Sequence, residues 1–113
     1  MKRFFSFIFL SFLVIAIAFA GGRTFRVEKD GKDVGSIAIK WEAPTRTNSG
    51  GLCYKIRIVN YSNENVSGLI VATGTDNNGK SAGFELGPKG DKFVYVFTTG
   101  QADDFIIPVI NVK

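Results

Sequence analysis

The chain has no histidine, and its 113 residues include only one cysteine, one tryptophan and three prolines. It therefore lacks the ligands for a Cys/His zinc site or a histidine-held haem, the base of a histidine-dependent triad, and the thiols for several disulfides. A general base would have to be a carboxylate or a lysine, and the acidic residues fall mostly at expected turns or outward strand positions. We therefore expect a protein that is not an enzyme and that holds no metal or cofactor.

Charge is also absent from residues 4–20, which are almost entirely apolar. Lys2 and Arg3 precede this run, and the small-x-small sequence Ala18-Phe19-Ala20 ends it. A basic start, an apolar middle and a cleavage site in this order are typical of a signal peptide. We expect residues 1–20 to be removed on export; an uncleaved anchor is the alternative, because the run is at the short limit for a membrane span. The product would be secreted, periplasmic or at the cell surface, without membrane contact after cleavage.

The remaining residues, 21–113, are enough for one domain. Of the 14 basic residues two lie in the leader, which leaves 12 against 10 acidic residues and a net charge of +2. These charges are scattered along alternating positions, so we expect no nucleic-acid partner. Short alternating apolar runs are separated by Gly, Asn, Asp and Pro, a pattern that favours an antiparallel β-sandwich.

The alternation predicts seven strands. They are Thr24–Glu28, Val34–Trp41, Leu52–Asn60, Val66–Thr73, Ser81–Leu86, Lys92–Thr98 and Asp104–Val112. Hairpin turns are predicted at Lys29-Asp30-Gly31-Lys32 and at Asp76-Asn77-Asn78-Gly79. The sixth strand is apolar on both faces and is expected to be central or covered, whereas Pro108 moves the seventh towards an edge or a bulge. Strand spacing places six aromatic residues in the core: Trp41, Tyr54, Phe84, Phe93, Tyr95 and Phe97.

Several of these segments resemble a fibronectin type III domain. The segment Ile37–Pro44 matches its core tryptophan followed by proline, and Tyr54–Ile58 matches the tyrosine that opens its third strand. Leu86–Gly90 resembles its Leu-x-Pro-Gly turn, and Phe93–Phe97 falls on its alternating sixth strand. The resemblance implies a seven-stranded immunoglobulin-like sandwich. That family usually places its fourth and fifth strands in different sheets, whereas the Asp76–Gly79 turn favours pairing them, so another immunoglobulin-like variant stays open.

Three residues are candidates for covalent modification. Cys53 is the only thiol of an expected exported chain, and it either forms an intermolecular disulfide or is a small residue buried under a neighbouring segment. Asn60 and Asn65 each begin an Asn-x-Ser pattern, which is a glycosylation acceptor if the host is a eukaryote and otherwise ordinary turn composition.

The leading functional hypothesis is an exported, non-enzymatic binding module for an extracytoplasmic protein or glycan. Binding would use loops at one end, namely Ala43–Gly51, Gly74–Gly79 and Thr98–Asp103, or an exposed strand edge. The fourth strand, with Leu69-Ile70-Val71, is the expected open edge. The alternatives are a structural subunit of a surface assembly, which would form a homodimer through Cys53 or an edge strand, and a small secreted hydrolase inhibitor acting through Thr45–Gly51.

Overall fold

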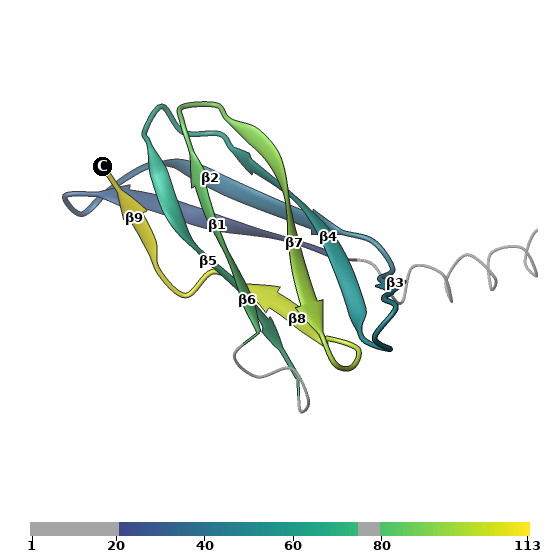
Figure 1. Cartoon of the computed structure of the whole chain (residues 1–113). Coiled ribbons are helices and arrows are strands. Elements are labelled where there is room, and N and C mark those ends of the chain that lie inside the picture. Colours follow the sequence, from purple (N-terminus) through teal and green to yellow (C-terminus); the bar gives the residue numbers. More distant parts are fainter. Residues whose placement is uncertain (1–20, 75–79) are drawn as a thin grey trace, which may run out of the picture.

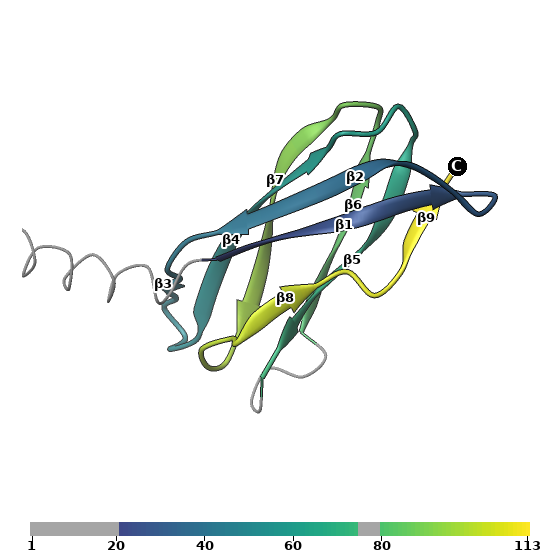
Figure 2. The ribbon, with the colours of Figure 1, turned by 180° about the vertical axis from the view of Figure 1, so that it is seen from behind.

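The computed structural model describes residues 21–74 and 80–113, which form two antiparallel β-sheets packed face to face (Figures 1 and 2). The strands are β1 (Gly21–Lys29), β2 (Lys32–Trp41), β3 (Thr45–Arg46), β4 (Leu52–Asn60), β5 (Val66–Thr73), β6 (Ser81–Leu86), β7 (Asp91–Thr98), β8 (Asp104–Ile106) and β9 (Ile110–Val112). The predicted all-β class is confirmed, and the predicted third, fourth and fifth strands coincide with β4, β5 and β6.

One sheet, called sheet A here, has the order β1-β2-β4-β7, and the short β3 pairs with the start of β4. The β1–β2 hairpin closes at Asp30 and Gly31, whose φ angles are 54° and 78°. Both angles are positive, as a two-residue primed turn requires, so the hairpin predicted at this Asp-Gly pair is confirmed. The hairpin sets the register that places Gly21 opposite Trp41 at the far end.

The second sheet, sheet B, has β5 at its centre, β6 on one side, and β8 and β9 on the other. The expectation that the Val66–Thr73 strand forms an open edge is therefore wrong, because β5 is paired on both sides. The predicted seventh strand is interrupted at Pro108 into β8 and β9 at the edge, as its missing N–H predicts. The predicted turn at Asp76–Gly79 lies outside the described residues, but β5 and β6 do pair antiparallel.

This strand order differs from that implied by the family resemblance. β5 and β6 lie in one sheet, whereas the type III arrangement usually separates the fourth and fifth strands. β2 and β4 also pair directly, although the corresponding second and third strands of immunoglobulin domains belong to opposite sheets. The core and turn motifs that carry the resemblance thus occur here on a different topology.

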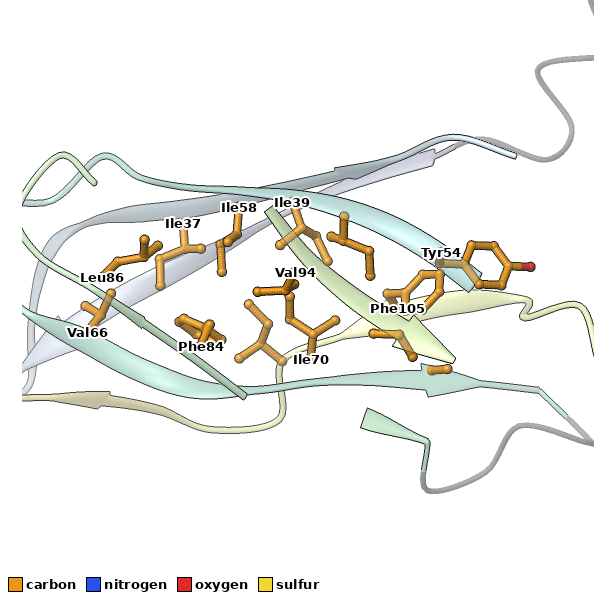
Figure 3. Packing of buried hydrophobic residues seen from close by; sticks show 14 of the residues in the cluster. Ile37, Ile39, Tyr54, Ile58, Val66, Ile70, Phe84, Leu86, Val94 and Phe105 are labelled. Carbon is orange, nitrogen blue, oxygen red and sulfur yellow. The ribbon is translucent and has the colours of Figure 1, made fainter. Parts of the chain in front are cut away.

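Inward side chains of both sheets interdigitate to form the core (Figure 3). Alternation along β4 buries Tyr54, Ile56 and Ile58, while sheet B contributes side chains such as Ile70 and Phe105. Phe105 makes edge-to-face contacts with Trp41 and Tyr54, each at 4.9 Å between ring centroids. The prediction of a core position is therefore confirmed for Tyr54 and Phe84, and Trp41 packs partly buried against the core.

The prediction that the sixth strand is central or covered is wrong. β7 pairs with β4 alone among the described strands and forms an edge of sheet A. Val94 and Val96 point into the core, but Phe93, Tyr95 and Phe97 are 50%, 50% and 62% exposed on the opposite side. Strand alternation correctly separated these two sets of side chains but did not reveal that no described segment covers the aromatic set.

Candidate functional site on the outer face of sheet A

The outer face of sheet A carries a row of three exposed aromatic side chains along its edge. This aromatic row, Phe93, Tyr95 and Phe97, comes from alternate positions of β7, so the side chains repeat about every 6.7 Å. Exposed large apolar residues that adjoin one another are uncommon on a monomeric soluble domain and mark interaction surfaces. The row is therefore the first element of a candidate binding face.

Cationic side chains lie immediately beside the aromatic row. The register places Arg57 of β4 opposite Phe93 on one side and opposite Lys40 of β2 on the other, and Lys55 is opposite Tyr95. We call Lys40, Lys55 and Arg57 the cation cluster. Like charges directly opposite on neighbouring strands are unfavourable in a sheet, so the placement of Lys40 opposite Arg57 does not itself stabilise the fold. Such local conflicts are typical of functional sites.

The cation cluster and part of the aromatic row enclose an open hollow of about 560 Å³. It is lined by Gly21, Gly22, Lys40, Trp41, Glu42, Lys55, Arg57 and Phe93. Gly21 lets the chain approach closely, since a Cβ there would lie 2.6 Å from the Trp41 ring. The volume is within the range of sites that bind small ligands, and the combination of the Phe93 ring with a few charged groups fits such a site.

The three cations are held in different ways. Arg57 donates from Nε to Asp91 Oδ1 at 3.1 Å and from Nη2 to Oδ2 at 2.5 Å, a fork that raises the pKa of Arg57 and lowers that of Asp91. Lys55 Nζ lies 4.3 Å from the centroid of the Phe93 ring, a cation–π contact. Neither Lys55 nor Lys40 has a carboxylate within 4.0 Å in residues 21–74 and 80–113, so their charge is available to a ligand.

Cys53 lies on this same face and is a half-buried free thiol. It stands between Phe97 of β7 and Thr45 of β3 in the sheet register. Its position at the end of the aromatic row leaves both sequence-based interpretations open, since the thiol is neither sealed in the core nor fully exposed.

The two predicted glycosylation acceptors differ sharply in exposure. Asn60 is fully buried, and its side-chain nitrogen donates to the carbonyls of Glu64 and Gly87, both at 2.8 Å. Its oxygen accepts from the N–H and the hydroxyl of Ser62. A glycan on Asn60 is therefore incompatible with this packed turn, whereas Asn65 is exposed.

The loops predicted to bind partners lie close together at one end of the sandwich as far as they are described, residues 75–79 lying outside the described part. Gly51 packs on the backbone of Thr98, and Gly74 packs against Asp103. The Thr45–Gly51 segment folds back on itself: Thr47 N–H donates to Gly51 O and Gly51 N–H donates to Thr47 Oγ1. It is thus a closed turn whose first residues pair with β4.

Within the part of the chain that the structure describes, no group of three or more Cys, Asp or Glu side chains is arranged to hold a metal ion. No helix in these residues is long and apolar enough to cross a membrane.

Comparisons of the chain with protein-family models, with curated proteins and with solved structures gave no match. The case for function therefore depends on the geometry of the site.

Sequence reasoning missed this site because it assigned the aromatic row to the core. One signal was present: Lys55 and Arg57 alternate with the buried residues of β4, and the aromatic residues of β7 have the same two-residue period. The pairing of β4 with β7, which brings these two sets together, involves residues about 40 positions apart, and periodicity carries no information on such pairings.

Proposed function

We propose that this protein is an exported, non-enzymatic binding module that binds an anionic glycan on the outer face of sheet A. The observation that carries this proposal is the hollow where the cation cluster meets the Phe93 ring. Sugar rings have apolar C–H faces that pack on aromatic rings, and carboxylate or sulfate groups pair with ammonium and guanidinium groups. A glycan with acidic groups uses both features of this face.

The local charge favours an acidic ligand over a neutral one. Arg57 is paired with Asp91, so the charges left without an ion pair at the hollow are Lys40, Lys55 and Glu42, a net excess of one cation. An acidic group between the two ammonium groups would also relieve the repulsion within the cation cluster. Glu42 is a lone carboxylate in the lining, and glycoside hydrolysis ordinarily uses a pair, so the hollow fits binding better than cleavage.

Export is supported by the leader-like residues 1–20, and the proposed location is secreted, periplasmic or cell-surface. Cleavage after Ala20 would leave Gly21, the first residue of β1, as the new terminus, and no described strand would be lost. The new α-amino group would then stand beside the hollow that Gly21 lines and add a further positive charge. Intact-mass measurement of the recovered protein tests this: a mass that retains residues 1–20 would contradict cleavage.

Binding is tested with an uronic-acid oligosaccharide and a neutral glucan of equal length, titrated by calorimetry against the exported protein. The double variant Lys40→Ala/Lys55→Ala is expected to lose at least about tenfold in affinity for the acidic glycan. Lys29→Ala/Lys32→Ala removes the same charge at the opposite end of the β1–β2 hairpin and is the matched control.

The acidic glycan should bind more weakly as salt is raised, because its contacts are charged and partly exposed. Equal affinity for the neutral glucan, or equal loss in the control variant, would mean that the hollow does not recognise acidic sugars. Both outcomes are read from the same titrations and need no knowledge of the natural ligand.

A second candidate function, a structural subunit of a surface assembly, is favoured by a different feature, the open edge of β7. The open edge of β7 suggests a dimer whose formation does not depend on glycan binding.

A further inference from the structure

Three of the four sheet edges carry features that oppose the addition of another strand, and β7 does not. β1 is interrupted by a bulge at Val27/Glu28 and carries Arg23 and Arg26. The β8/β9 edge is broken at Pro108, and β6 is a six-residue strand that contains Gly83. Short strands, bulges, charges and prolines are the usual protection of sheet edges.

By contrast, β7 is eight residues long and pairs with β4 in one continuous register. It contains no proline and no glycine, and charge is confined to its first two residues, Asp91 and Lys92. A long edge strand with apolar side chains and without a bulge is a template for another strand.

The hydrogen bonds at the start of β7 show which backbone groups face the open edge. Asn60 N–H donates to Gly90 O, so Gly90 directs its carbonyl towards β4. Along an extended strand the N–H and C=O of one residue point the same way and alternate between neighbours. Phe93, Tyr95 and Phe97 therefore direct their N–H and C=O groups away from β4, towards the side where the described residues supply no strand.

The sequence of β7 is also self-complementary. Phe93-Val94-Tyr95-Val96-Phe97 reads the same in both directions. If two copies pair antiparallel with Tyr95 opposite Tyr95, then Phe93 lies opposite Phe97 and Val94 opposite Val96. Aromatic side chains thus meet aromatic ones on the outer face, and valines meet valines on the inner face. Asp91 and Lys92 fall beyond this core, opposite threonines, so no like charges face each other.

We propose that β7 pairs antiparallel with β7 of a second copy of this chain, about a two-fold axis at Tyr95, to form one continuous sheet across the dimer. A two-fold interface requires a surface that complements itself, and the palindromic strand supplies one. The outward-facing backbone of Phe93, Tyr95 and Phe97 gives three hydrogen-bonded residue pairs, or about six hydrogen bonds. The aromatic rows of the two copies become neighbours, and each cation cluster stays on the outer face.

The size of the contact sets the expected strength. If an aromatic side chain presents about 100 Å² when half exposed, full cover of six of them removes at most about 600 Å². The aromatic side chains alone thus supply about half of the roughly 1,200 Å² in total at the lower end of stable interfaces, so we expect a dimer that dissociates in the micromolar range.

The same geometry excludes a disulfide as the link in this dimer. Cys53 of β4 lies opposite Phe97 of β7. In the dimer, the two Cys53 residues are therefore separated by three strand spacings across the sheet, about 14 Å, and by four residues along it, about 13 Å. Their Cα atoms would be about 19 Å apart, whereas a disulfide needs less than about 7 Å. The dimer should therefore be insensitive to reductant.

The test is sedimentation equilibrium of the exported protein, from about 1 to 500 µM, with and without reductant. Tyr95→Lys places two ammonium groups opposite each other at the axis and should raise the dissociation constant at least about tenfold. Tyr95→Glu should do the same. An equimolar mixture of the two variants should recover the dimer, because lysine of one copy then faces glutamate of the other. This recovery is expected only if residue 95 of one copy lies opposite residue 95 of the second copy.

Leu69→Lys is the matched control, since Leu69 is 52% exposed on the outer face of sheet B and should not affect association. Backbone amide exchange of the unaltered protein is a second measurement. The Phe93, Tyr95 and Phe97 amides should exchange fast when dilute and slow down as concentration rises, whereas those of Val94 and Val96 stay protected. A monomer over the whole concentration range, a dimer lost on reduction, or no recovery in the mixture would overturn the proposal. Glycan titration is a separate readout, so either proposal can fail alone.

Discussion

The buried side chain of Asn60 is expected to be the most important polar group for stability, and Asn60→Ala should show it. The side chain joins the end of β4 to the β4–β5 turn and to the β6–β7 turn through four hydrogen bonds. Alanine would leave the carbonyls of Glu64 and Gly87 and the N–H of Ser62 without these partners. At about 1 kcal/mol net per bond, with water reaching part of the turn, the free energy of unfolding should fall by about 3 kcal/mol.

For a domain of this size the loss corresponds to a fall in Tm of about 12–24 °C. Thermal and urea unfolding followed by circular dichroism measure both quantities, and the urea slope should stay unchanged if only the native state is affected. Asn65→Ala is the control, because Asn65 begins the same Asn-x-Ser pattern but is exposed. It should change stability by less than about 0.5 kcal/mol. If Asn60→Ala costs under about 1 kcal/mol, or no more than Asn65→Ala, the connection of the turns through this side chain has been overestimated.

Two further predictions concern the backbone and acid stability. Gly35→Ala should destabilise the fold by at least about 2 kcal/mol in urea titrations. The reason is that Gly35 has a φ of 141° and that a Cβ there would lie 2.7 Å from Ser62 Cβ. Gly31 has a φ of 78° and open space around it, so Gly31→Ala should lower the free energy of unfolding clearly less. The pKa of Asp104 is lowered chiefly by its hydrogen bond with Arg23, so the stability from this pair is fully present above the unfolded pKa near 3.9 and is lost as pH falls through the lower folded value. Melting curves from pH 6 to pH 2 should therefore decline less in Asp104→Asn than in the unaltered protein, and equal slopes would show that the pair does not contribute.

The sequence allowed most of the local structure to be predicted, because each local feature has a local cause. Alternation defined β4, β5 and β6 to the residue, and the Asp30-Gly31 pair fixed the first hairpin. Pro108 marked the break between β8 and β9, since a residue without an N–H cannot continue a ladder. The pairing of strands distant in sequence was not predictable in this way, and the family resemblance suggested a different order from the one in the structure.

The candidate site shows the same division between local and long-range information. Alternation placed Val94 and Val96 on one side of β7 and Phe93 and Tyr95 on the other. It could not decide which side would be covered, because that depends on whether a strand lies beyond β7. Buried Asn60 is the opposite case: an Asn-x-Ser pattern at a turn favours exposure, and only the approach of the Gly87 carbonyl from a distant turn buries it.

The core is formed by the inner faces of the two sheets, whereas a partner would contact an outer face. Both sheets contribute inward side chains to one core, so the core places no demand on either outer face. On the outer face of sheet B, the central strand β5 exposes one large apolar side chain, Leu69. On sheet A, three half-exposed aromatic residues and three cations lie side by side, with Lys40 directly opposite Arg57 and β7 as an unprotected edge. Edge strands are ordinarily protected by charges, prolines or bulges, and the aromatic positions of β7 carry none of these. Both proposals account for this concentration on one face: an acidic sugar would bind at the cation cluster, and a second β7 would pair along the edge.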